Sequence, residues 1–305
     1  MGTIKVDFGP KQLEITEESI RAMVEQKPRR MKISEEFSDI YGVIKPYEGG
    51  GDWSVRFPFV ETFGNAFDSL YQGAHIGMRT NKNGRCYTFL SGTCSSEEPP
   101  EGAEGCCQTI GKYVALRDCM ALSFALDYDH QGGDPEKPHS TVGQLRNLAK
   151  PRDGSVPAAV NYKKGGKGLA HLCLEFLNDL ECYKKANCVV AMPSSTPGKK
   201  YDLPRSLANI FSTKLGIENF SEHVSTTKKR AQLKGLKASQ RLDEIRETIS
   251  VGQGVFEGKT VLLVDDVFQS GISINYVAML LQQAGAKKIF GLTCDKTCSN
   301  TDNIG

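Results

Sequence analysis

The most regular hydrophobic pattern of the chain lies between residues 260 and 284. Residues 261–264 form an apolar run without a polar face, which is typical of a strand buried on both sides of a parallel sheet. A short polar turn with Gly271 follows, and apolar residues then recur at helical spacing over residues 274–284, with Ser273 as the expected N-cap. The pattern therefore predicts a buried strand, a tight loop and a helix.

The same alternation of strands and helices extends over the second half of the chain. It predicts an α/β, Rossmann-like domain around a mainly parallel sheet of about five strands in residues 156–305. Residues 1–155 are less regular and are expected to form an N-terminal α+β region that acts as a separate domain or as a hood over the other one. The other predicted elements are helices at 17–26, 109–126, 169–180, 204–215 and 239–249 and strands at 3–8, 13–15, 188–192 and 288–293.

Two acids, Asp265 and Asp266, end the predicted central strand. A loop that runs into a helix N-terminus offers unpaired backbone N–H groups and a positive dipole end, so it suits a phosphate. Two adjacent carboxylates suit sugar hydroxyls instead, directly or through a divalent cation. The expected ligand is a sugar that carries a phosphate; the alternative is an ordinary βα turn with solvated acids.

A second loop between a predicted strand and a predicted helix has the same character. It follows the strand at 188–192 and combines hydroxyl groups, a glycine and a lysine. Because the carboxyl ends of parallel strands meet at one edge of a sheet, both loops should lie close together. The candidate anion-binding residues of this loop are Ser194, Ser195, Thr196, Gly198 and Lys199.

Composition and charge describe a soluble globular protein. The 305 residues are 24% charged and 39% hydrophobic. No apolar run approaches the ~20 residues that span a bilayer, and no signal-peptide pattern opens the chain, so cytoplasm is the expected location, without a membrane partner. Residues 1–150 carry a net charge of −4 and residues 151–305 one of +6, which fits an anionic ligand in the second half. A nucleic-acid partner is not indicated and not excluded.

Ten cysteines in a chain of this kind are expected to be mostly reduced thiols. The paired Cys-x2-4-Cys spacing of zinc knuckles is absent, so zinc is unlikely. A polar loop at 127–134 contains Asp127, Asp129, His130 and Asp134, which could bind a metal, although a surface loop is the plainer interpretation. Separately, Cys294 and Cys298 could add ligands to a zinc site formed by the other cysteines. The weak zinc candidates elsewhere are Cys86, Cys94, Cys106, Cys107 and Cys119.

A cationic segment lies between the two phosphate-binding candidates. Residues 225–236, called the cationic loop below, are rich in Lys and Arg and poor in large apolar residues. They are expected to form a mobile loop over the anion site, the alternative being a merely solvated loop. Its candidate site residues are Lys228, Lys229 and Arg230.

The strand, acid pair and loop at 261–273 resemble the phosphoribosyl pyrophosphate (PRPP) signature of type I phosphoribosyltransferases. The resemblance implies that Asp265 and Asp266 hold the ribose hydroxyls and that the following loop holds the 5′-phosphate. Gln269 departs from the small hydroxyl residue usual at its position. The implied phosphate-loop residues are Val267, Phe268, Gln269, Ser270, Gly271, Ile272 and Ser273.

Together with the acid pair, the residues at 162–165, 168–170, 192–193, 229–232 and 241 resemble the ComF-like branch of that family, so the similarity extends over residues 158–296. The N-terminal zinc ribbon of that branch is absent here. The resemblance implies a pyrophosphate loop at 194–199 and a closing loop at 225–236. It also implies Mg²⁺ bound with PRPP, Lys199 and the cationic loop at the leaving pyrophosphate, and a nitrogen nucleophile that the sequence does not identify.

Three functions follow as hypotheses. The first is a phosphoribosyltransferase that uses PRPP. The second is a non-catalytic sensor or effector that binds PRPP or a nucleotide, which the Gln269 departure and the large N-terminal region favour and which fits a bacterial defence system. The third is a nucleotide or PRPP hydrolase on the same scaffold. A homodimer is the expected assembly, and a protein partner could bind through the N-terminal region.

Overall fold

The protein is described by a computed structural model. It describes residues 11–25, 112–151, 155–196, 198–228, 236, 238–246 and 248–298, and the backbone of the strands at 30–32, 53–57, 75–80 and 86–92. Among the described residues, no helix is long and apolar enough to cross a membrane.

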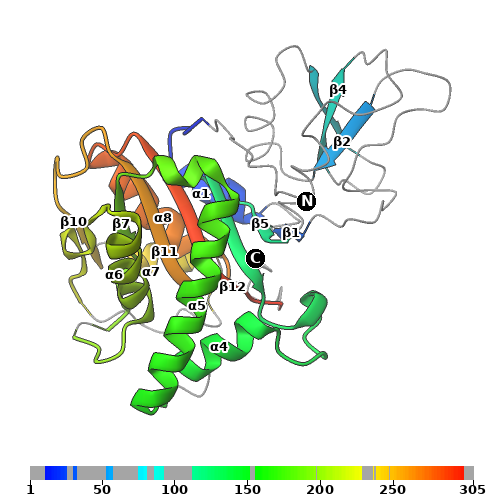
Figure 1. The fold of residues 1–305 in the computed structure, drawn as a ribbon. Coiled ribbons are helices and arrows are strands. Elements are labelled where there is room, and N and C mark those ends of the chain that lie inside the picture. Colours follow the sequence, from blue (N-terminus) through cyan, green and yellow to red (C-terminus); the bar gives the residue numbers. More distant parts are fainter. Residues whose placement is uncertain are drawn as a thin grey trace.

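A seven-stranded sheet organises the described part of the chain, in the order β1-β5-β6-β12-β11-β7-β8 (Figure 1). The five strands from β6 to β8 run parallel, whereas β5 pairs antiparallel with β6, and β1 with β5. The prediction of an α/β fold with a mainly parallel sheet is therefore confirmed. The strands are β1 Arg30–Lys32, β5 Val114–Leu116, β6 Leu122–Tyr128, β7 Cys188–Ala191, β8 Glu218–Asn219, β11 Thr260–Phe268 and β12 Lys288–Lys296.

Helices cover both faces of this sheet (Figure 1). Side chains of α4 Thr141–Ala149, α5 Ala159–Asp179 and α6 Leu203–Leu215 belong to the hydrophobic core on one face. Side chains of α1 Glu17–Glu25, α7 Ala238–Ile245 and α8 Ile272–Gln283 belong to the core on the other face. The sheet is thus the middle layer of three.

Strand β11 contributes to both cores. Leu262 and Val264 pack into the α5–α6 side, while Val261 and Leu263 pack into the α1–α8 side, and all are at most 1% exposed. Successive side chains of a strand point to opposite faces, so a strand in the middle layer needs an unbroken apolar run. This explains the pattern from which the strand was predicted.

Smaller elements complete the described fold. A three-stranded antiparallel sheet has the order β2-β4-β3, and β10 pairs antiparallel with β9. Three short 3-10 helices connect larger elements. Their bounds are β2 Trp53–Phe57, β3 His75–Thr80, β4 Cys86–Gly92, β9 Val224–Thr226, β10 Ile249–Val251, η2 Gln131–Gly133, η3 Glu181–Lys185 and η4 Ser221–His223.

The helix predicted at residues 109–126 is wrong over its described part. The chain there forms β5, a turn and β6. In the turn, the Asp118 carboxylate accepts a hydrogen bond from the Met120 N–H at 3.0 Å, which favours a bend over helix continuation. Residues 122–126 of β6 are buried on both faces, so the apolar residues of this strand do not alternate with polar ones and also satisfied a helical spacing.

The sheet extends across the expected boundary at residue 155. Strands β1, β5 and β6 precede that residue, yet β6 pairs with β12 along most of its length. The described segments 11–25 and 112–151 therefore pack with the later elements in the two cores on either face of the sheet. A separate domain or hood within residues 1–155 stays a prediction.

Tyr183 provides a test of this packing. Its ring is 1% exposed, and its hydroxyl lies 3.1 Å from the Leu122 carbonyl of β6 and 2.9 Å from the Gly291 carbonyl of β12. We expect Tyr183→Phe to lower the free energy of unfolding by about 1–2 kcal/mol, because the buried hydrogen bonding of its hydroxyl to the carbonyls of β6 and β12 is lost. Urea denaturation with an unchanged m-value would measure this loss.

Tyr201→Phe is the matched control. Tyr201 is half-buried, and no hydrogen bond of its hydroxyl is recorded within the described residues. A loss at Tyr183 no larger than at Tyr201 would contradict the structural role of the Tyr183 hydroxyl.

Candidate functional site

The site lies where β7 and β11 separate. The two strands pair up to Ala191 and Val264, and the Met192 N–H still donates to the Val264 carbonyl at 2.8 Å. Strand β7 then leaves the sheet, whereas β11 continues beside β12 as far as Phe268. A cavity of about 540 Å³ opens at this carboxyl edge, where ligands of open α/β sheets commonly bind.

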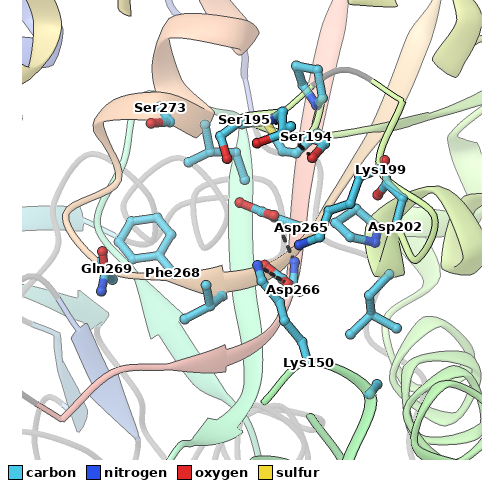
Figure 2. Close-up of a pocket in the computed structure, with 18 of the residues that line it drawn as sticks. Lys150, Ser194, Ser195, Lys199, Asp202, Asp265, Asp266, Phe268, Gln269 and Ser273 are labelled. Carbon is cyan, nitrogen blue, oxygen red and sulfur yellow. Dashed lines mark hydrogen bonds and ion pairs between the residues drawn. The ribbon is translucent and has the colours of Figure 1, made fainter. Parts of the chain in front are cut away.

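Asp265 and Asp266 stand within β11 at this opening. The strand was predicted to end at these acids but extends to Phe268. Figure 2 shows the Asp265 carboxylate pointing into the cavity below Ser194 and Ser195, whereas Asp266 lies beside Lys150. Adjacent strand residues point to opposite faces, so the acid pair divides between two surroundings.

The loop after β11 depends on Gly271. This residue has φ 80° and is the N-cap of α8, which begins at Ile272, so the expected N-cap role of Ser273 is wrong. A Cβ at this position would stand 2.6 Å from the Phe268 ring. Left-handed backbone and close packing together require glycine here. Ser273 lies in the first turn of the helix and lines the cavity.

Asn275 braces this loop from beneath and is fully buried. Its side-chain amide donates to the Gly271 carbonyl at 2.7 Å, and its oxygen accepts the Cys119 N–H at 2.7 Å. Because Cys119 lies between β5 and β6, the phosphate-loop candidate is fixed to the first half of the chain.

Lys296, at the end of β12, holds the same loop from the other side. Its ammonium group donates to the Gln269 carbonyl at 2.9 Å and to the Thr297 carbonyl at 3.1 Å, and it lies 5.7 Å from the Phe268 ring centre. The Gln269 side chain itself is exposed at the cavity rim. The backbone of the loop is thus fixed independently of the side chain at position 269.

The second loop reaches the same cavity. Ser194, Ser195, Thr196 and Lys199 line it, opposite the loop that follows β11 (Figure 2). The Thr226 hydroxyl of β9 donates to the Ser194 carbonyl at 2.6 Å and holds the loop in place. Gly198 lies in this loop with φ 68°.

Both described ends of the cationic loop are attached near the cavity. Thr226 contacts the Ser194 backbone, and the Arg241 guanidinium, itself a cavity-lining group, donates to the Leu236 carbonyl at 2.8 Å. Lys228 is exposed. Lys229 and Arg230 lie outside the described residues.

An ion pair between Lys150 and Asp266 dominates the electrostatics of the site. Burial alone would raise the pKa of the Asp266 carboxyl, but the Lys150 ammonium group outweighs it and holds that pKa below its usual value. Burial likewise opposes the charge of Lys150, yet the carboxylates of Asp266 and Asp265 raise its pKa overall. Asp266 is therefore ionised and already neutralised by a cation.

Asp265 behaves in the opposite way. Burial, and then repulsion from the neighbouring Asp266 carboxylate, raise the pKa of the Asp265 carboxyl to about 8. Two adjacent acids with pKa values shifted in opposite directions are typical of a functional site. Asp265 would be favoured in its ionised form by a cation that enters the cavity.

The sequence analysis missed several residues of the cavity wall. Lys150 follows α4, which gave no separate signal, and Asp202 was not recognised as the N-cap of α6. Burial raises the pKa of the Asp202 carboxyl, with a further contribution from Asp266. Tyr201 and Arg241 also line the cavity.

The remaining predicted residues have varied positions. Val267 and Phe268 line the cavity, as do Ser270 and Gly271, while Ile272 is buried in the core. Of the zinc candidates, Cys119 is half-buried, and its backbone serves the Asn275 brace. The side chains of Cys86, Cys94, Cys106 and Cys107 lie outside the described residues.

Comparison with known proteins supports the family resemblance over part of the chain. Residues 205–300 match the family model described as the phosphoribosyl transferase domain. This match includes the acid pair and the loop after β11, and the type I phosphoribosyltransferase resemblance is confirmed at that level. No curated protein matches the chain.

Solved structures give weaker likenesses. A purine phosphoribosyltransferase from Pyrococcus horikoshii Ot3 is 16% identical, with a TM-score of 0.27, over 43% of this chain and 80% of that one. The glutamine PRPP amidotransferase from B. subtilis, complexed with ADP and GMP, is 16% identical with a TM-score of 0.29, over 72% of this chain and 43% of that one. An allosteric regulatory enzyme of purine biosynthesis is 12% identical with a TM-score of 0.28, over 85% of this chain and 64% of that one. Likenesses this weak carry no functional argument.

Gly271→Ala tests the loop after β11. We expect this variant to lose about 1–2 kcal/mol from the left-handed backbone, and more from the contact with the Phe268 ring. Gly216→Ala is the matched control, because Gly216 has φ 67° but its added Cβ would meet nothing within 4 Å. Equal losses in urea denaturation at the two positions would contradict tight packing around Gly271.

The raised pKa of Asp265 predicts a pH-dependent stability. Between the unfolded value of about 4 and the folded value of about 8, native Asp265 keeps a proton that the unfolded chain has released. Stability is therefore lost as pH rises through this window. At pH 8 we expect Asp265→Asn to have a free energy of unfolding higher than that of the wild type by on the order of 1 kcal/mol, allowing for solvent screening. Urea denaturation should show this gain at pH 8 and not at pH 4.

Asp266→Asn is the contrasting variant. Because the folded pKa of Asp266 is lowered by Lys150, its contribution is present above the unfolded pKa of about 4 and is lost as pH falls through the folded pKa. We expect this variant to be less stable than the wild type at neutral pH. Identical pH profiles for the two variants would contradict the opposite pKa shifts.

Proposed function

We propose that this chain, whose residues 205–300 match the phosphoribosyl transferase domain model, binds PRPP with Mg²⁺ and transfers its phosphoribosyl group to a nitrogen nucleophile. Pyrophosphate is the leaving group. One observation carries the proposal: the acid pair and both strand-to-helix loops, distant in sequence, line a single cavity.

The cavity offers a different surface to each part of PRPP. The N-terminus of α8, with the backbone of residues 269–273, suits the 5′-phosphate. Asp265 faces the adjacent space and suits the ribose hydroxyls, which donate hydrogen bonds to a carboxylate. The hydroxyl groups of residues 194–196 and Lys199 suit the pyrophosphate.

The donor set also fits Mg²⁺, which prefers oxygen ligands and is commonly bound through one or two carboxylates together with substrate phosphates. Asp265 would be the protein ligand, because Asp266 is already paired with Lys150. The bound ion supplies charge neutralisation at the departing pyrophosphate. Deprotonation of Asp265, with its raised pKa, would accompany binding.

The protein contributes orientation and charge to the reaction. Cleavage of the ribose C1–pyrophosphate bond leaves positive charge on the ribose and negative charge on the leaving group. Lys199 lies where it can stabilise the pyrophosphate, and Lys228, with Lys229 and Arg230, would add to this when the cationic loop closes. Closure would also exclude water from the reactive sugar.

A sensor that binds PRPP or a nucleotide without turnover is the second candidate. Two observations favour it: Gln269 replaces the usual small hydroxyl residue at the cavity rim, and Lys150 already neutralises Asp266. The Lys150 pair would weaken the contribution of Asp266 to Mg²⁺ and ribose binding. Gln269 would alter the side-chain contacts of the phosphate loop, whose backbone could still bind a phosphate.

Expectations about the family branch, location, assembly and biological context come from the sequence alone. A ComF-like branch, a cytoplasmic location, a homodimer, a protein partner at the N-terminal region and membership of a bacterial defence system remain proposals.

Calorimetric titration with PRPP, with and without Mg²⁺, tests the proposal. We expect saturable binding that Mg²⁺ strengthens and that the Asp265→Asn/Asp266→Asn double variant weakens by roughly tenfold or more, because each lost charged hydrogen bond is worth ~1.5–3 kcal/mol. The control is Asp243→Asn, an acid exposed on α7 and paired with Arg21. Absence of PRPP binding under both conditions would contradict the proposal.

Pyrophosphate release in the same samples separates the candidate functions. Release that needs an added nitrogen nucleophile supports transfer, and release with water alone supports a hydrolase. Binding without release, also in the presence of a panel of bases and amines, supports the sensor.

A further inference from the structure

Three potential metal ligands meet beyond the carboxyl ends of β6 and β12. Asp129 and His130 directly follow β6, and Cys298 lies two residues after β12. The carboxylate oxygen, imidazole nitrogen and thiol sulfur all lie within 4.8 Å of one another. The His130 Nδ1 is 3.3 Å from the Asp129 carboxylate.

Backbone hydrogen bonds hold these residues in position. The Cys298 N–H donates to the Asp129 carboxylate at 2.8 Å, and the Asp129 N–H donates to the Lys296 carbonyl at 3.0 Å. His130 forms an isolated antiparallel bridge with His139, and their rings stack at 4.2 Å between centres. The ligands therefore come from two segments that the sheet fixes side by side.

The surroundings are those of a cation site. Asp129 is 4% exposed and Cys298 is 5% exposed. Asp295, three residues before Cys298, is fully buried. Arg146 is paired with Asp295 through a 2.7 Å contact. A buried cation would offset the negative charge of a carboxylate and a thiolate here.

We propose that Asp129, His130 and Cys298 bind a structural Zn²⁺ ion. A thiolate, an imidazole and a carboxylate are the ligand types that zinc takes, whereas Mg²⁺ and Ca²⁺ take oxygen ligands. Metal–ligand bonds of about 2.0–2.3 Å require donor separations of roughly 3.5 Å, so the three groups would approach one another slightly on binding. The fourth position would be held by water or by a further ligand.

This zinc site was not expected from the sequence. Zinc was judged unlikely, and these residues were named only as separate weak candidates: Asp129 and His130 in a loop interpreted as solvated, and Cys298 as a possible added zinc ligand. The Cys298 thiol approaches the His130 carbonyl across a separation of 168 residues. Ligands this far apart in the chain cannot show the short paired spacing that usually signals a zinc site in a sequence.

The site would stabilise the phosphate-loop candidate indirectly. Lys296 is two residues before Cys298, and its ammonium group holds the Gln269 carbonyl. A metal that ties Cys298 to the segment at 129–130 would fix the end of β12 and hence this contact. The zinc proposal nevertheless stands apart from PRPP binding and has its own readout.

Metal analysis of the full chain tests the proposal. Protein purified without a polyhistidine tag under reducing conditions is loaded with zinc, passed over a chelating resin and analysed for zinc per chain. We expect the wild type to keep about one zinc per chain and Cys298→Ser and His130→Ala each to lose it. Loss of a residue that only supports a metal ligand lowers metal affinity ~10–100-fold, so loss of a ligand itself should lower it at least as much.

Matched controls identify the ligands. Cys107→Ser and Cys119→Ser remove other cysteines, and His171→Ala removes an imidazole on the exposed side of α5; all should keep the zinc. X-ray absorption at the zinc edge of the wild type should show one sulfur neighbour and otherwise nitrogen or oxygen. This measurement needs no variant, so it remains decisive if a substitution prevents folding.

Several results would overturn the proposal. They are a wild type that keeps no zinc, ligand variants that keep as much zinc as the wild type, loss of the same equivalent in Cys107→Ser, or a zinc spectrum with several sulfur neighbours or none.

Discussion

The burial of β11 on both faces is the constraint on which the rest of the structure depends. Four residues of this strand are covered by helices from either side, and the strand then continues past the point where β7 leaves the sheet. The cavity opens at the point where the backbone pairing between β7 and β11 ends. Asp265 and Asp266 directly follow this point in β11, where a carboxylate can reach either a ligand in the cavity or a counter-ion.

Charges at this edge of the sheet come in compensating pairs. Asp266 faces Lys150, and Asp295 faces Arg146, all at or near the ends of β11, β12 and α4. Ionised groups that are largely removed from water are costly unless paired, so the position of α4 against the sheet is coupled to the acids of the site. Burial raises the pKa of the Asp295 carboxyl to about 6 despite Arg146. Burial and repulsion from Asp266 raise the pKa of Asp265 to about 8, which leaves Asp265 receptive to a cation from solution.

The first half of the chain takes part in the site through the Lys150 side chain and through backbone groups that support the cavity. Asn275 joins the helix that follows the acid pair to Cys119, and the Gln12 side chain contacts the backbone of both Cys119 and Ile289. These contacts explain why the sheet cannot be divided at residue 155 without breaking supports of the cavity. A family match confined to residues 205–300 therefore covers only part of the residues that build the cavity, since Lys150 and the loop at 194–199 lie before it.

The sequence by itself determined the α/β class, the central strand, the acid pair and both loops, because each depends on local patterns: an unbroken apolar run, a glycine before a helix, hydroxyl groups after a strand. It failed at residues 109–126, where strands buried on both faces have no alternation that distinguishes them from a buried helix. Only the tertiary structure decided that Lys150 neutralises Asp266, that Asn275 and Lys296 support the loop between them, and that Asp129, His130 and Cys298 meet. These contacts join residues far apart in the chain, and it is the order of strands in the sheet, which no local pattern encodes, that brings them together.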